Sequence, residues 1–206
     1  MFTKMLKKAI HKSQHCNRNW DLSKNIPQED IDLILESAVQ CPVKQNLNYY
    51  KTHVFTDRKS IEKIHSYTEG IMAENSDTGE RKEVTNSQTL ANMVVVFTKD
   101  TPTYVREASE VNNPDADTYK EDRIMSVGIA SAYVNYTASL LGYETGCCKC
   151  FDGEGLTSLF NGEQPLLIMG IGYPDKTRSR LEHHQNSSWK MPTMPNKRES
   201  VVHTAA

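Results

Sequence analysis

The segment Gln14-His15-Cys16-Asn17-Arg18 gathers polar and basic side chains directly after a predicted helix. An arginine guanidinium presents a fixed fork of hydrogen-bond donors, which suits a phosphate group. Taken alone, the same residues also suit a solvated loop after a helix. The segment is therefore a candidate anion contact, and its spacing alone does not specify the ligand.

A second candidate is Cys147-Cys148-Lys149-Cys150, which holds three of the five cysteines. Zinc requires four ligands, usually as two separated pairs, and the chain has no second pair of this kind. Neighbouring cysteines on a strand would also point to opposite faces of the sheet. A metal site, a thiol relay and inert buried cysteines all remain open, and we favour inert cysteines. The odd cysteine number does not indicate a disulfide framework, so a reducing compartment is expected.

The elements that position these residues follow from hydrophobic periodicity. We expect helices over 2–14, from Pro27 to Cys41, over 58–73, about 119–141 and 156–160. Strands are expected over 50–56, 92–98, 144–148 and 165–172, with the second buried on both faces. Gly142 is the expected end of the longest helix. The polar stretches 74–88 and 106–122 are expected to be exposed loops or lids. Helices and strands in this order indicate an α+β fold.

Composition limits the functions that we consider. At 206 residues, with no internal repeat or linker, the chain suits one domain over 1–206. A net charge of −2 creates no field that would gather nucleic acid or anionic lipid. No apolar run reaches the roughly 18 residues of a membrane span. The first residues lack the apolar core of a signal peptide, so a cytoplasmic location is expected.

Three segments together resemble the FMN-dependent nitroreductase family over nearly the whole chain. Residues 14–20 are similar to its opening R-[RH]-S-x-[RK]-x-[FW]. Residues 42–50 are similar to its P-S-x-x-N-x-Q-P-W turn, with Asn46 at the most characteristic position. Residues 141–152 resemble its L-G-[VL]-x-[AS]-x-P-[IM]-[EG]-G-F-[DE] segment without a gap. Gln14 replaces an Arg, Cys16 replaces a Ser, and Asn48-Tyr49-Tyr50 stands where Gln-Pro-Trp is usual.

The resemblance implies which residues would hold FMN. The first segment would contact the phosphate, the ribityl chain and the pyrimidine edge. The turn would cover one isoalloxazine face, often from the second subunit, and the third segment would lie along the flavin and donate an amide to N5. Lys149 would make that site more positive, and a basic pair in the tail would complete the phosphate clamp. The implied cofactor-binding residues are Gln14, His15, Cys16, Arg18, Pro42, Val43, Lys44, Asn46, Asn86, Cys147, Cys148, Lys149, Cys150, Lys197 and Arg198.

The resemblance also implies an architecture and an activity. The fold would be α+β, with a mixed, mostly antiparallel sheet flanked by helices, in a domain-exchanged homodimer. The helix over 119–141 would pack at the dimer centre, and the tail from about 175 would reach across the partner. NAD(P)H would reduce FMN, and a nitroaromatic, quinone or enone would then take the electrons in a ping-pong cycle. No catalytic side chain is implied, because the chemistry lies on FMN.

Two alternatives remain at this stage. One is a specialised flavoenzyme of the same fold: a dehalogenase, an enoate saturase or a flavin-modifying enzyme. The other is a degenerate, non-catalytic flavin-binding protein, suggested by the replacements at Gln14, Cys16 and Val43.

Overall fold

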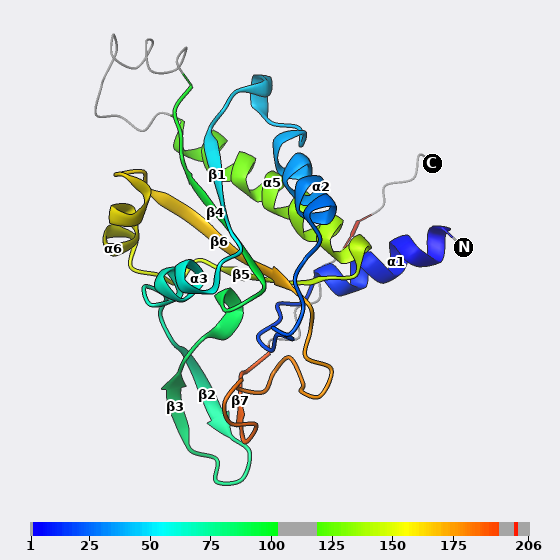
Figure 1. The fold of residues 1–206 in the computed structure, drawn as a ribbon, viewed down its shortest axis with the longest axis vertical. Helices are drawn as coiled ribbons and strands as arrows, with labels where there is room; N and C mark the ends of the chain where they lie inside the picture. Colours follow the sequence, from blue (N-terminus) through cyan, green and yellow to red (C-terminus); the bar gives the residue numbers. More distant parts are fainter. Residues whose placement is uncertain (1, 103–118, 194–199, 202–206) are drawn as a thin grey trace.

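The centre of the molecule is a four-stranded sheet in the order β1-β4-β6-β5 (Figure 1). The computed structural model describes residues 2–102, 119–193 and 200–201. The strands are β1 (Tyr50–Phe55), β4 (Met93–Lys99), β5 (Glu144–Cys148) and β6 (Pro165–Gly172). Their pairings are antiparallel, and Cys16 adds a parallel bridge to Thr145 at the outer edge of β5. The sheet is mixed and mostly antiparallel, which confirms the expected fold class.

Helices cover both faces of this sheet. One face carries α2 (Gln28–Val39) and α5 (Lys120–Leu141), and α1 (Phe2–Ser13) packs beside α5. The other face carries α3 (Arg58–His65), α6 (Gly153–Thr157) and the 3-10 turn η3 (Ser158–Phe160).

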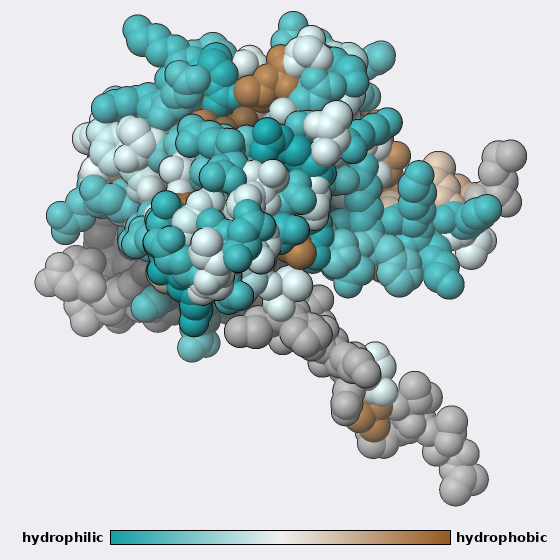
Figure 2. Space-filling model, turned by 90° about the horizontal axis from the view of Figure 1, so that it is seen from below, coloured by the Kyte–Doolittle hydropathy of each residue, from teal (hydrophilic) through white to brown (hydrophobic). Residues whose placement is uncertain are grey.

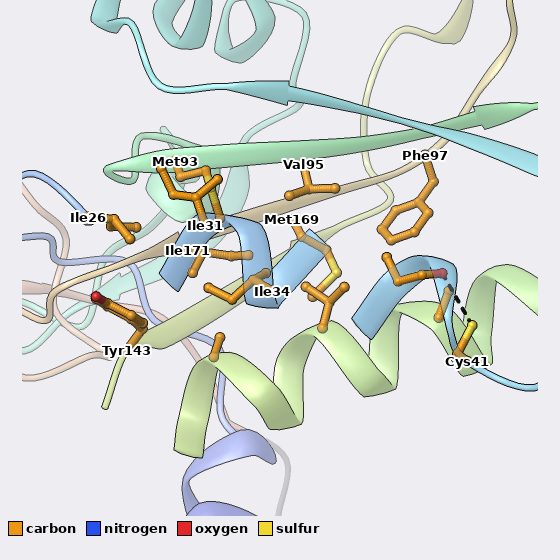
Figure 3. Packing of buried hydrophobic residues seen from close by; sticks show 14 of the residues in the cluster. Ile26, Ile31, Ile34, Cys41, Met93, Val95, Phe97, Tyr143, Met169 and Ile171 are labelled. Atoms are coloured by element: carbon orange, nitrogen blue, oxygen red, sulfur yellow. Dashed lines mark hydrogen bonds between the residues drawn. The ribbon is translucent and has the colours of Figure 1, made fainter. Parts of the chain in front are cut away.

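Side chains along β4 point alternately to the two faces of the sheet, so apolar side chains cover both faces. Met93, Val95 and Phe97 pack with α2 and α5, whereas Val94 and Val96 pack with α3 and α6. Figure 3 shows the first cluster, in which residues of α2 lie between β4 and α5. The prediction that β4 is buried on both faces is confirmed, because all five side chains are fully buried.

The longest helix, α5, ends at Gly142, whose φ of 103° is the left-handed conformation that glycine adopts without strain. This helix is long and apolar enough to cross a membrane by length and composition, although the sequence shows no uninterrupted apolar run. Its packing accounts for this composition. Val127, Ala130, Val134 and Ala138 lie in the core against the sheet, and the core helix of a domain passes the same test.

The region between 58 and 90 differs from its prediction. The expected helix over 58–73 ends at His65, and residues of the expected loop over 74–88 form a hairpin of β2 (Ile71–Asn75) and β3 (Arg81–Val84). β2 also pairs with β7 (Trp189–Lys190), more than a hundred residues away. The 3-10 turn η2 (Ser87–Thr89) is buried rather than exposed. Local pairing therefore forms the hairpin, and a partner distant in sequence extends it to three strands.

The remaining elements lie close to their predicted ranges, and the helix expected over 156–160 appears as α6 followed by η3. Of the expected lid over 106–122, residues 106–118 lie outside the described part of the chain. The tail from 175 packs on its own chain as far as 193, through β7 and β2. A reach across a partner by the rest of the tail stays a prediction. Seen from the hairpin end, the surface is mostly hydrophilic, with scattered apolar side chains (Figure 2).

Candidate functional site: the outer edge of β5

The segment after α1 runs along the outer edge of β5. The Asn17 amide donates to the Thr145 carbonyl at 2.7 Å, next to the bridge between Cys16 and Thr145. Asn135 on α5 holds the end of α1 and the strand β5 together. Its side-chain nitrogen donates to the Ser13 carbonyl at 2.7 Å, and its oxygen accepts from the Thr145 hydroxyl at 2.6 Å. The first and third motifs, which lie about 130 residues apart in sequence, are thus neighbours in space.

Arg18 is the most unusual side chain at this edge, because it is only 8% exposed and carries a charge. Its Nε has no hydrogen-bond partner among the described residues. Burial lowers the pKa of its guanidinium, and the nearby Arg180 lowers it further. A buried cation with an unused donor is costly unless an anion or a polar oxygen contacts it. The environment of Arg18 therefore suits an anionic or oxygen-rich ligand.

Gln88 holds Arg18 against β5. When the Gln88 amide is oriented to satisfy its neighbours, its oxygen accepts from Arg18 Nη2 at 2.9 Å. Its nitrogen then donates to the Cys147 carbonyl at 2.8 Å. The Ser87 hydroxyl also donates to the Arg18 carbonyl at 2.6 Å. The turn η2 therefore fixes both the backbone and the side chain of Arg18.

Gly146 allows these three segments to meet. A Cβ at this position would lie 2.9 Å from the Asn17 carbonyl oxygen and 3.0 Å from Gln88 Cβ. Real Cβ atoms are hardly ever found so close to backbone atoms. Glycine is required here by this close approach and not by its backbone conformation.

The cysteines of β5 point to opposite faces, as predicted. Cys147 packs with the α2–α5 cluster and Cys148 with the α3–α6 cluster. Burial raises the pKa of Cys147 to about 12 and that of Cys148 to about 11, so both thiols are neutral at pH 7. A thiolate is the form that attacks substrates and binds metals. This supports the interpretation of inert thiols. Among the described residues, no His, Cys, Asp or Glu side chains form a group of three or more that could hold a metal.

Lys149 and Cys150 follow β5 directly and are exposed. Lys149 lies over the Phe151 ring at 5.3 Å, and the Cys150 carbonyl accepts weakly from the Cys148 thiol. The two residues lie at the end of β5 toward which Arg18 points. They place a positive charge at this edge of the sheet, and the Cys150 carbonyl also accepts from the Glu69 amide at 3.0 Å.

His15 and Asn86 lie close to this edge. His15 precedes the Cys16 bridge, and burial followed by the charge of Arg180 lowers its pKa. Asn86 is buried beside η2, and its Oδ1 has no partner among the described residues. Gln14 donates back to the His11 carbonyl and is exposed, so its side chain is turned away from β5 toward α1.

The turn over residues 42–46 lies elsewhere. Gln45 and Asn46 have positive φ angles of 55° and 54°, and Lys44 pairs with Asp122 at 2.7 Å near the start of α5. The 14–18 segment is instead anchored to Asn135, thirteen residues further along α5, or roughly 20 Å at 1.5 Å per residue. Figure 1 shows α5 running between these two ends. Within one chain, Pro42, Val43, Lys44 and Asn46 do not join the other candidates, and their role as a cover from a second copy stays a prediction.

The tail candidates Lys197 and Arg198 lie outside the described residues. Sequence reasoning missed Gln88, Ser87 and Asn135, whose contacts assemble this edge. The weak match at Asn86 was the available signal for the first two, since it placed the 86–88 stretch near the site. Nothing in the sequence around Asn135 indicated its bonds to Ser13 and Thr145.

Comparisons with known proteins agree with this geometry. A profile described as "Nitroreductase family" matches residues 12–173, which includes the segment at Cys16, the turn at Asn46 and all of β5. No curated protein sequence matches the chain.

Solved structures show the same fold at low sequence identity. A nitroreductase family protein from Clostridium novyi NT is 15% identical, with a TM-score of 0.62 over 88% of this chain and 90% of that one. A candidate nitroreductase from Exiguobacterium sibiricum, solved in complex with FMN, is 16% identical, with a TM-score of 0.62 over 87% and 90%. An FMN-dependent nitroreductase from Clostridium difficile R20291 is 16% identical, with a TM-score of 0.56 over 85% and 88%. The profile match covers well over half of the residues, and the chain therefore belongs to the nitroreductase family.

Proposed function

We propose that this protein is an FMN-dependent oxidoreductase that passes electrons from NAD(P)H to an electron-poor acceptor, such as a nitroaromatic, a quinone or an enone. The observation that carries the proposal is the buried Arg18 guanidinium, which keeps an unused Nε donor at the edge of β5. Family membership supports it, as do the E. sibiricum and C. difficile structures, whose names include FMN.

The residues at this edge fit FMN. Arg18, with its unused donor, would contact a phosphate or carbonyl oxygen of the cofactor, and His15 and Cys16 lie beside it. The buried, unpaired Oδ1 of Asn86 would accept a hydrogen bond from the cofactor's ring system. Cys147 to Cys150 would line the cofactor along β5. Cys16 is a weaker donor than the usual serine, and Gln14 brings no charge, so Arg18 would carry more of the binding than its counterpart does in the family.

When bound, FMN supplies the redox chemistry, since it can take two electrons from NAD(P)H and give them to the acceptor. The protein's contribution is to position the reactants and to set the local charge. Gln88 holds the Arg18 guanidinium in place, and Lys149 adds a positive charge at the end of β5. The thiols of Cys147 and Cys148 are neutral and packed into the two core clusters, so they do not compete as nucleophiles. No acid–base side chain is needed for this role.

A homodimer is part of the proposal. Ile124, Met125 and Tyr133 on α5 are exposed large apolar side chains, with Ile124 59% exposed in the single chain. They lie on one side of a helix that also carries the exposed Gly128 and Ala132, so a second copy could approach closely. Such a dimer would bring the turn over 42–46 of one chain toward the β5 edge of the other. We place the dimer in the cytoplasm.

A visible spectrum of the purified protein tests the proposal. We expect a bound flavin that bleaches when NADH or NADPH is added without oxygen and regains its colour when a quinone or a nitroaromatic follows. A colourless protein that takes up no FMN would contradict the proposal.

Two further outcomes point to the alternatives. A flavin that NAD(P)H does not reduce would indicate a degenerate flavin-binding protein, which the uncharged Gln14 and the weak donor Cys16 favour. A flavin that NAD(P)H reduces but that none of these acceptors reoxidises would indicate a specialised member of the fold. Product analysis with halogenated, enoate and flavin substrates would then identify its reaction.

A further inference from the structure

A cavity of about 1100 Å³ lies between α1, the junction of α5 and β5, and the loop over 173–180. Its charged lining is mostly positive. The cations are Lys8, Lys12, Lys24, Lys176, Arg178 and Arg180. The acids are Glu144 and Asp175. The lining therefore has a formal charge of +4, although the whole chain carries −2. Positive charge is concentrated here against the overall balance of the protein.

Half of these cations have no partner in the part of the chain that the structure describes. Lys24 pairs with Asp21 at 2.8 Å, Arg178 lies 3.9 Å from Asp175, and Lys12 donates to the Gly142 carbonyl at 2.5 Å. Lys8, Lys176 and Arg180, in contrast, form no hydrogen bond or ion pair with a described residue.

Their mutual repulsion is visible at Lys12. Burial is the main cause that lowers the pKa of this lysine; Glu144 raises it, and the charges of Lys8 and Lys176 lower it. Like charges gathered in a partly enclosed space raise the free energy of the protein until an anion neutralises them. The cavity is therefore suited to a ligand with several negative charges.

The wall that carries Arg178 and Arg180 is fixed in advance. The buried Asn19 side chain donates to the Ser179 carbonyl at 2.7 Å and to the Glu182 carbonyl at 2.9 Å. The Asn19 carbonyl accepts from the Asp175 amide at 2.9 Å. A loop held in this way loses little conformational entropy when a ligand binds.

The cavity adjoins the proposed flavin site, because its Arg180 lies close enough to Arg18 and His15 to lower the pKa of both, but none of the described residues assigned to FMN lines it. Asn17 lines the cavity, whereas Arg18 points toward Gln88 and Cys147. A ligand here would therefore lie beside the proposed FMN site and contact different side chains. The volume exceeds that needed for a simple inorganic ion and lies in the size range of small-molecule sites.

We propose that this cavity binds a ligand carrying a diphosphate group, with Lys8, Lys176 and Arg180 donating charge-assisted hydrogen bonds to its oxygens. Two sources share this chemistry: a nucleoside diphosphate and free pyrophosphate. The inference goes beyond the proposed oxidoreductase function and does not depend on it, because none of its cations was assigned to FMN.

Isothermal titration calorimetry tests the inference, with ADP, pyrophosphate and adenosine as probes. The protein is saturated with FMN, or used as purified if it takes up no flavin. We expect ADP or pyrophosphate to bind, adenosine not to bind, and the affinity to fall as salt is added. Binding of ADP alone would assign the site to a nucleotide, and equal binding of pyrophosphate would assign it to the free anion.

Matched variants locate the site. Lys176→Ala and Arg180→Ala should each weaken binding by about tenfold or more, the value of one charge-assisted contact. Lys4→Ala removes an exposed lysine of α1 that does not line the cavity, and it should leave binding unchanged. Absence of binding up to millimolar probe, an equal effect of Lys4→Ala, or displacement of the probe by FMN would each overturn the inference.

Discussion

The edge of β5 carries two of the three family motifs and the turn over residues 42–46 carries the third, and the two regions differ in how one chain completes them. At the edge of β5, Arg18, Gln88 and Gly146 meet within a single chain through hydrogen bonds of 2.8 and 2.9 Å and close backbone contact. The turn lies near the start of α5, where its Lys44 pairs with Asp122. The first region is built by folding alone, whereas the second would reach the proposed cofactor only in the homodimer that we propose.

The largest expected effect concerns the second region. Ile124→Glu should weaken the proposed dimer by about 3–6 kcal/mol, because a buried isoleucine is worth about 1.5–3 kcal/mol and a twofold interface contains it twice. Light scattering coupled to gel filtration measures the change in mass. Leu159→Glu, at another exposed apolar side chain, is the matched control and should stay dimeric. A dimer that persists in Ile124→Glu would remove α5 from the interface.

The next prediction tests the close packing around Gly146 at the edge of β5. Gly146→Val should lower the free energy of unfolding by about 3 kcal/mol, because overpacking against backbone costs about 1–3 kcal/mol and valine adds branched bulk. Urea denaturation measures it. Gly153→Ala adds a Cβ that meets nothing within 4 Å, so its stability should stay the same or rise by less than about 1 kcal/mol. Equal stability of the two variants would contradict the close approach.

Arg18→Ala should weaken FMN binding by about 1.5–3 kcal/mol, the value of a hydrogen bond to a charged group. This corresponds to a tenfold to hundredfold rise in the dissociation constant, measured by flavin fluorescence. Lys4→Ala is the control, because that side chain is exposed on α1. The same affinity in both variants would remove Arg18 from the cofactor site.

Lys149→Ala should shift the flavin midpoint potential to a more negative value, since the lysine charge favours the reduced, anionic cofactor. The shift should be modest, because Lys149 is exposed and screened by solvent. Spectroelectrochemical titration measures it, with Lys4→Ala, at an exposed position of α1, as the control. Identical potentials in wild type and Lys149→Ala would show that this charge does not reach the flavin.

The last prediction is a pH dependence at β5 that appears only in alkaline solution. Burial raises the pKa of Cys147 from its ordinary value of 9.0 to about 12, so the folded state favours the neutral thiol. The stability that this thiol contributes is fully present below pH 9 and is lost as the pH rises toward 12. Cys147→Ala should therefore flatten the fall in unfolding free energy over this window. An unchanged slope would contradict the burial of the thiol.

Sequence reasoning located most of the scaffold because its signals are local. The apolar run at Met93–Lys99 predicted a strand buried on both faces, and Gly142 predicted the end of the long helix. The hairpin of β2 and β3 was missed because its two strands are short and mostly polar, so they lack the apolar pattern of a strand, and its pairing with β7 lies far along the chain. The helical spacing of Ile61 and Ile64 correctly predicted α3. No local signal in the sequence showed that this helix ends at His65.

The sequence by itself determined the family motifs, the helices and strands with clear periodicity, and the residue types available for an anion. Only the tertiary structure decided which of them work together. Gln88 and Ser87 bury the Arg18 candidate and hold it at the edge of β5. The length of α5 separates the 42–46 turn from that edge. The cationic cavity emerged from three distant segments. The physical reason is that periodicity reports each element's own burial, whereas burial of a charge and the gathering of like charges depend on contacts between elements.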